Sequence, residues 1–149
     1  MADFVFNIAK GEVKKYAKLD GGANDALIVV PIEATGVEAD DVLNNYDDLA
    51  ALLAAANNEQ TTMGRKTISA SVTITVDDTN NRVDIDIPDQ VWTAATGNAI
   101  SDLLICYDPD TTAGTDSSVV PLTCHDFSAT PDGSDLTAQV AAAGFFRAS

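Results

Sequence analysis

The sequence predicts an α+β fold, built on a mainly antiparallel β-sheet that forms a sandwich or a partial barrel. The first observation is that most segments have the alternating or short apolar patterns of strands, with short turn-like links between them. The second is that only residues 40–56 carry a strong helical period, with a weaker one near the N-terminus. Because short links join antiparallel neighbours, we expect an antiparallel sheet with the helices packed against it.

The clearest strand pair is expected between Ile68 and Ile87. In its first arm apolar residues alternate with Ser and Thr, and in its second arm they alternate with Arg and Asp. Successive side chains of a strand point to opposite faces, so each arm has one apolar face. Residues 77–81, Asp-Asp-Thr-Asn-Asn, favour a turn. The stretch therefore predicts a hairpin whose apolar face needs a covering layer.

One strong helix is predicted over residues 40–56. Apolar residues recur there at steps of four and three, at Val42, Tyr46, Leu49, Leu53 and Ala56. This helix is the expected cover for the hairpin. A weaker helix is expected from Asn7 to about Leu19, because Gly11 lowers its helical propensity.

The other strands follow from short apolar runs. They are expected at Phe4–Phe6 as an edge strand, at 27–32, at 103–107 and at 119–129. Pro31 indicates that the second of these is an edge, or ends, at that residue. Asp89 is expected to cap a short turn that carries Trp92. Residues 136–140 alternate and predict a second hairpin with 119–129, while a helix over 136–143 stays open as the alternative.

Length and charge limit the classes of protein. The 149 residues predict one domain, 1–149, and the net charge is −15. Such an acidic chain repels nucleic acid and anionic membranes, and contains no apolar run of the roughly 18 residues that a membrane helix needs. The first residues lack the pattern of a signal peptide, so the chain is expected to be made in the cytoplasm.

Half of the eight basic residues lie within nine positions near the N-terminus. They are Lys10, Lys14, Lys15 and Lys18. This cluster predicts contact with an acidic partner or with the acidic body of a neighbouring copy, and residues 1–25 are a candidate anchoring segment. A solvated helix face is the alternative interpretation.

The residues that carry catalysis are sparse. The single histidine, His125, is followed by Asp126, which would point the other way on a strand, so a Ser-His-Asp triad is not expected. Cys106 and Cys124 are expected to be buried free thiols, and with His125 they lack the spacing of a zinc site. The sequence therefore predicts no enzyme and no cofactor.

An acidic loop is the weak candidate for a metal site. Asp108, Asp110 and Asp116 could surround a hard cation with oxygen ligands, although the spacing departs from that of an EF-hand. A turn-rich solvated loop is the alternative. Asp84 and Asp86 share one face of their strand and are expected to be the solvated face of the hairpin.

Six strings of residues spread over most of the chain carry a family resemblance. They are Phe-Asn-Ile-Ala-Lys-Gly at 6–11, Pro-Asp-Gln-Val-Trp at 88–92, the stretch 102–116, His-Asp-Phe at 125–127, Thr-Pro-Asp-Gly-Ser-Asp at 130–135 and Gly-Phe-Phe-Arg-Ala at 144–148. The chain resembles a family of small structural proteins of tailed bacteriophages. The resemblance implies a component of the virion and no catalytic residue.

The expected function is that of a non-enzymatic virion protein, a capsid decoration or minor capsid protein on the shell surface. Its expected partners are the major capsid protein or other virion proteins, and further copies of itself in a homo-oligomer. One alternative is a tail, connector or fibre-base component. Another, from a different class, is a cation- or carbohydrate-binding module that uses the loop 108–116.

Overall fold

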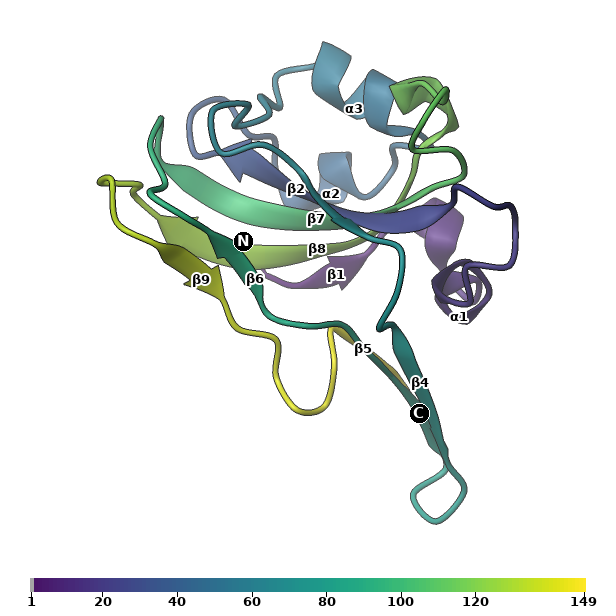
Figure 1. Ribbon diagram of the computed structural model, residues 1–149. Helices are drawn as coiled ribbons and strands as arrows, with labels where there is room; N and C mark the ends of the chain where they lie inside the picture. The colour runs from purple at the N-terminus through teal and green to yellow at the C-terminus, as the bar shows by residue number, and fades with distance from the viewer. Residues whose placement is uncertain (1) are drawn as a thin grey trace.

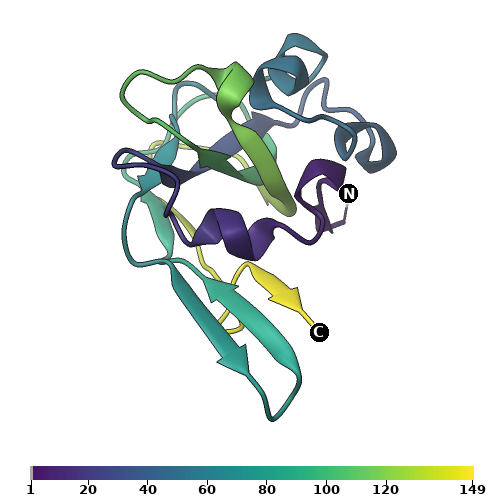
Figure 2. The same cartoon turned by 90° about the vertical axis from the view of Figure 1, so that its right-hand side faces the viewer.

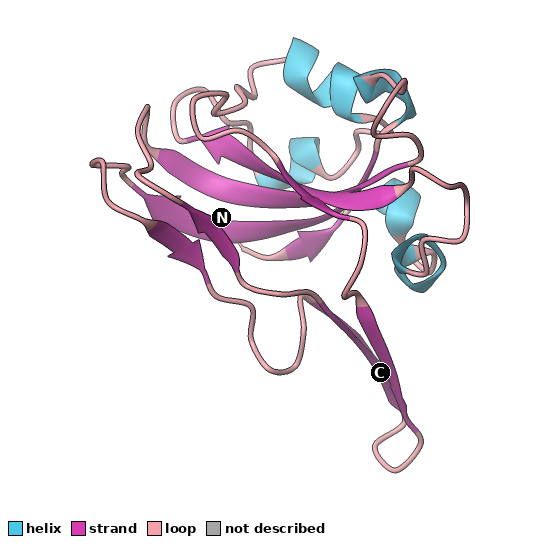
Figure 3. Cartoon of the chain, viewed as in Figure 1, coloured by secondary structure: helices cyan, strands magenta, loops and turns pink. Residues whose placement is uncertain are grey.

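A five-stranded antiparallel sheet forms the body of the computed structural model, which describes residues 2–149 (Figures 1 and 3). Met1 lies outside the described residues. The strand order is β1-β8-β7-β2-β3. These strands are β1 (Phe4–Val5), β2 (Ala26–Glu33), β3 (Lys66–Ile68), β7 (Ile100–Asp108) and β8 (Val120–Ala129). The predicted α+β fold with mainly antiparallel strands is confirmed.

The centre of this sheet is formed by β2 and β7, which are buried on both faces because apolar residues occupy nearly every position. Pro31 lies beyond the point where β3 pairs, since β3 pairs only with Leu27 to Val29. The Pro31 carbonyl instead accepts a hydrogen bond from the Gln60 N–H at 2.9 Å. In the described chain, no named strand pairs with this side of β2 at its proline, but β2 continues to Glu33 and an isolated bridge joins Ile32 to Glu59, so the strand neither ends nor is open there.

A second, smaller sheet projects from the body and is called the arm (Figures 1 and 2). It has the order β10-β5-β4, from Phe146–Ala148, Arg82–Asp86 and Thr73–Asp77. The predicted hairpin is confirmed, but its first strand is shorter than expected. Ile68 belongs to β3, and the chain turns at Ser71, whose φ is 65°, before β4 begins.

The third sheet pairs β6 (Gln90–Trp92) with β9 (Leu136–Ala138). Residues 136–138 form a strand, but the prediction of a hairpin with β8 was wrong. The turn at 130–135 explains why β9 pairs with β6, because it bonds to the residues that follow β6. The Ala95 N–H donates to the Ser134 carbonyl, and the Ala94 N–H donates to the Asp135 carboxylate. Trp92 lies in β6 rather than in a turn, and its indole N–H donates to the Gly64 carbonyl.

The prediction of one strong helix over residues 40–56 was wrong. Two short helices, α2 (Asp40–Leu43) and α3 (Leu49–Ala54), occupy this stretch. The Asn45 side chain donates to the Asp41 carbonyl at 2.6 Å, and the Asp48 carboxylate accepts from the Ala51 N–H at 2.8 Å. Asn and Asp side chains thus compete for the backbone groups that a continuous helix would use, ending one helix and capping the next.

These helices do not cover the hairpin. In Figure 1, α2 and α3 lie on the side of the central sheet opposite the arm, and the Leu49 N–H donates to the Val119 carbonyl just before β8. Buried Leu43, Leu49 and Leu52 contribute to the core there. The hairpin instead pairs with β10, the last strand of the chain.

The weaker N-terminal helix is also divided. A 3₁₀ turn at Asn7–Ala9 is followed by α1 (Val13–Ala17). Gly11 separates them with a φ of 81°, a left-handed conformation that glycine adopts without steric cost. Another 3₁₀ turn, Asp116–Ser118, precedes β8.

A carboxylate side chain lies inside the sheet. Asp102 of β7 is 1% exposed, and its carboxylate accepts hydrogen bonds from the Ser101 hydroxyl at 2.5 Å and the Cys124 thiol at 3.7 Å. Burial raises the pKa of Asp102 above its ordinary value of 3.8. The folded state therefore holds this proton more tightly than the unfolded chain.

We expect Asp102→Asn to stabilise the protein at pH 7 by about 1 kcal/mol, because it removes a buried charge. Its single amide oxygen can still accept from one of the two donors, and its NH2 group can donate to the Ser101 hydroxyl oxygen. A raised carboxyl pKa makes wild-type stability fall as pH rises from the unfolded pKa through the folded one. The advantage of the variant should thus shrink below about pH 4. Urea unfolding at pH 7 and below about pH 4 measures the difference in the free energy of unfolding between the variant and wild type. An equal difference at the two pH values would contradict a cost from the buried charge of Asp102.

Candidate functional site

The lysine cluster lies on an exposed surface. Lys10, Lys14, Lys15 and Lys18 are all exposed, on and beside α1. The Lys10 ammonium donates to Asn7 Oδ1 at 2.6 Å, and the Lys15 ammonium lies 3.0 Å from Glu12. These four exposed lysines are called the lysine face.

The segment that carries the lysine face belongs to the folded domain. Phe6, Val13 and Ala17 are buried in the core, and β1 pairs with β8. A contact made by this segment would therefore use its exposed face and not a loose tether. In two perpendicular views, α1 lies beside the base of the arm (Figures 1 and 2).

The arm has one apolar face, arranged in two rows. Ile74, Ile85 and Phe146 form the row nearer the body, and Val76, Val83 and Ala148 form the outer row. Ile85 is completely buried, whereas Val76 is 55% exposed, more than any other large apolar side chain in the described chain. The apolar face is thus covered by the body at its base and bare towards its tip.

The two outer edges of the arm are open. Among residues 2–149, no strand pairs with the outer edge of β4 or of β10. The sequence of β4, Thr-Ile-Thr-Val-Asp, contains no lysine, proline or bulge, the usual features that prevent an edge strand from pairing with another chain. A strand from another chain can therefore pair with an open edge of the arm, and the same chain can cover the apolar tip.

The other face of the arm is polar and held by ion pairs. Arg147 Nε lies 2.6 Å from Asp84 Oδ1, and Arg82 Nε lies 3.1 Å from Asp84 Oδ2. The hydrogen bond from Arg147 holds the pKa of Asp84 below its ordinary range. Asp84 is thus an ion-paired residue and not only a solvated one, while the Asp86 carboxylate accepts from the Ile87 N–H.

The acidic loop does not bring its carboxylates together. Asp116 is paired with Arg65, Asp108 accepts from the Asp110 N–H at 3.0 Å, and Asp110 accepts from the N–H and hydroxyl of Thr112. Within residues 2–149, no group of three or more His, Cys, Asp or Glu side chains is arranged to hold a metal ion. The structure therefore gives Asp108 and Asp110 a role as turn acceptors.

Arg65 ties this loop to the body through two carboxylates. Its guanidinium makes paired hydrogen bonds of 2.6 and 2.9 Å to Glu59, and another pair of 2.6 and 2.9 Å to Asp116. The guanidinium lowers the pKa of Asp116. Sequence reasoning missed this cluster, because Arg65 and Asp116 are 51 residues apart.

The histidine and the cysteines have structural partners. His125 Nδ1 lies 3.1 Å from Asp3 Oδ2, and Nε2 lies 2.9 Å from the Thr123 hydroxyl. Cys106 and Cys124 are buried free thiols, as predicted, and burial raises the pKa of both. A thiol held in its neutral form is a weak nucleophile.

No protein-family model, curated protein or solved structure matches the chain. None of the helices in the described part of the chain has the length and apolar composition of a membrane-spanning segment.

Proposed function

We propose that this chain is a non-enzymatic structural protein of a tailed-bacteriophage virion, and that it attaches to the shell as a capsid decoration or minor capsid protein. The arm is the observation that carries the proposal. It presents an open strand edge and an exposed apolar tip. The helix α1, which contains Lys14 and Lys15 of the lysine face, lies beside its base (Figure 1). The resemblance of six strings of residues to small virion proteins supports the same role.

The arm suits assembly because strand addition and apolar burial act together. A strand from a neighbouring protein that pairs with β4 would satisfy its open backbone groups and cover Val76. A stable interface typically buries at least roughly 1,000 Å², which is more than the addition of one short strand is expected to bury. Strand addition becomes effective when many copies are held on a symmetric shell, since linked contacts reinforce one another.

The lysine face adds charge recognition. Four exposed lysines on and beside α1 concentrate positive charge there, in a chain that carries −15 overall. An acidic surface of a shell protein or of a neighbouring copy would be attracted there, and the acidic body would be repelled from it. The orientation of the protein on the shell would follow from this asymmetry.

The test measures occupancy on particles with variants of each surface. Val76→Lys adds a charge to the exposed tip of the arm, and we expect it to reduce occupancy at least tenfold. Val91→Lys is the matched control, because Val91 is a strand valine 44% exposed outside the arm. Occupancy of the control should equal that of wild type, and equal loss in both variants would contradict a contact through the arm.

The double variant Lys14→Glu, Lys15→Glu tests the lysine face in the same assay. We expect its occupancy to fall, and the wild-type attachment to weaken as salt is raised, because exposed charges are screened. Unchanged occupancy of the double variant at low salt would remove the lysine face from the contact.

A further inference from the structure

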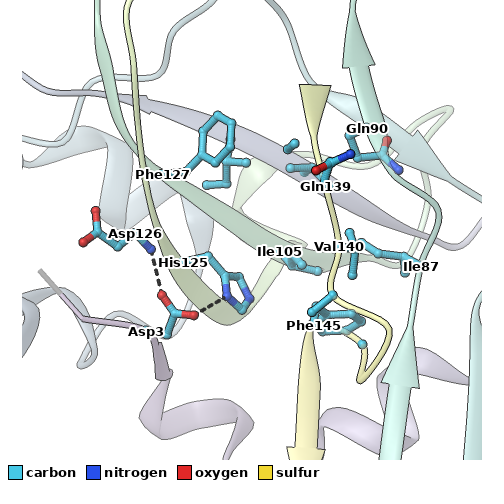
Figure 4. A pocket seen from close by; sticks show the side chains of 15 residues that line it. Asp3, Ile87, Gln90, Ile105, His125, Asp126, Phe127, Gln139, Val140 and Phe145 are labelled. Carbon is cyan, nitrogen blue, oxygen red and sulfur yellow. Dashed lines mark hydrogen bonds and ion pairs between the residues drawn. The ribbon is translucent and has the colours of Figure 1, made fainter. Parts of the chain in front are cut away.

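We propose that a cavity between the five-stranded sheet and the segment 136–145 is a binding site for a small, uncharged aromatic molecule. The cavity has a volume of about 260 Å³. Its lining includes Gln90 of β6 and Ala138 of β9 (Figure 4). In Figure 1, β6 and β9 lie on the side of the central sheet opposite α2 and α3. The inference goes beyond the proposed function and does not depend on it.

The cavity is walled by apolar side chains from two layers. Val29, Leu103 and Ile105 come from the central sheet, and Ile87, Ala138 and Val140 come from the opposite side. Four of these six, Leu103, Ile105, Ile87 and Ala138, are between 4% and 7% exposed. A molecule that enters would thus touch side chains that are almost entirely removed from water.

Two of the polar side chains that line the cavity already bond within the protein and are less available to hold water there. Both ring nitrogens of His125 are engaged, by Asp3 and by Thr123. The side-chain amide of Gln90 donates to the Pro88 carbonyl. Weakly bonded water is displaced favourably by an apolar group.

Size and ring geometry favour an aromatic ligand. An apolar cavity of about 150 Å³ is large enough for benzene, so 260 Å³ accommodates a fused ring such as indole. At the side of the cavity, the rings of His125 and Phe145 meet edge to face, with centroids 6.4 Å apart and an interplanar angle of 85° (Figure 4). A ligand ring can extend this arrangement.

Charge excludes anionic ligands. Asp3 lines one end of the cavity, and the chain as a whole carries −15. An anion of similar size, such as benzoate, would be repelled by this field and would lose its hydration on entry. Neutral indole and anionic benzoate are therefore the matched pair of probes.

The test is a thermal shift of the full chain with indole and with benzoate. We expect indole to raise the Tm in a saturable manner, by about 3–6 °C at ten times its Kd, and benzoate to leave it unchanged. Ala138→Leu places a larger side chain in the cavity and should abolish the indole shift. Ala142→Leu, at an exposed position outside the lining, should retain it.

A second measurement keeps the test decisive if Ala138→Leu fails to fold. In wild-type protein, indole should move the amide resonances of residues 103–105 and 138–145, which border the cavity, and leave those of the arm tip at 78–81 in place. The proposal is overturned by the absence of a saturable shift, by an equal shift with benzoate, or by resonance changes away from the cavity. Attachment to particles is measured in a separate assay, so a negative result with indole does not bear on the proposed virion function.

Discussion

Gly144→Ala is expected to destabilise the protein by roughly 3 kcal/mol and to detach β10 from the arm. Gly144 has a φ of 81°, and an added Cβ would fall on the Ile85 carbonyl oxygen and lie 2.5 Å from its carbonyl carbon. The neighbour is backbone and cannot rotate away. The chain would have to move at Gly144, two residues before Phe146 pairs with Ile85.

Gly11→Ala is the matched control for this variant. Gly11 has the same φ of 81°, but its added Cβ would have no neighbour within 4 Å. Gly11→Ala should lower the free energy of unfolding by only about 1 kcal/mol, because alanine is strained at a positive φ but meets no neighbouring atom. Urea unfolding gives both free energies, and amide exchange of residues 146–148 reports on the docking of β10. Equal costs in the two variants would contradict the close approach at Ile85.

Arg65→Met is expected to cost roughly 2–3 kcal/mol, because it leaves two partly buried carboxylates without a counter-charge. The side chains of Arg65, Glu59 and Asp116 are 28%, 13% and 35% exposed, so water offsets part of the penalty that a fully buried pair would carry. Loss of the guanidinium also frees the loop 108–116 from the body. Arg65→Lys keeps the charge but not the paired geometry, so its free energy of unfolding should lie between those of wild type and Arg65→Met.

The pH dependence of this variant follows from the lowered pKa of Asp116. A lowered carboxyl pKa contributes stability that is present above the unfolded pKa, and it is lost as pH falls through the folded pKa. The difference between wild type and Arg65→Met should therefore be full at pH 7 and decrease below about pH 4. Chemical unfolding at a series of pH values measures it, and a constant difference would contradict the ion-pair account.

Local patterns predicted the strands well. The alternation of Ile74 and Val76 with threonine, and of Val83 and Ile85 with charged residues, is a property of neighbouring positions, and the structure has β4 and β5 there. The same alternation identified 136–138 as a strand but gave no partner for it. Its partner β6 lies more than 40 residues earlier, and only the bonds of the 130–135 turn select it.

The helical period misled at 40–56 because it records apolar spacing only. The side chains that end α2 and cap α3 are Asn45 and Asp48, which lie between the apolar positions. An apolar period takes no account of polar residues at these positions, whereas the hydrogen bonds of their side chains to the backbone interrupt the helix.

The candidate site was predicted in part. The lysine cluster was visible in sequence, because its members are neighbours along the chain. The apolar tip of the arm was expected to be buried, since nothing in an alternating pattern tells which end of a hairpin leaves the body. Arg65 with Asp116, and Arg147 with Asp84, are separated by 51 and 63 residues, and only the fold brings them together.

The central claim is that the chain is a structural component of a virion shell. The most direct test is its copy number in purified particles, by quantitative mass spectrometry against the major shell protein. We predict a count comparable to that of the shell protein. A count that matches one small ring would place the chain in the tail or connector and contradict the capsid role, and its complete absence from particles would contradict the virion assignment itself.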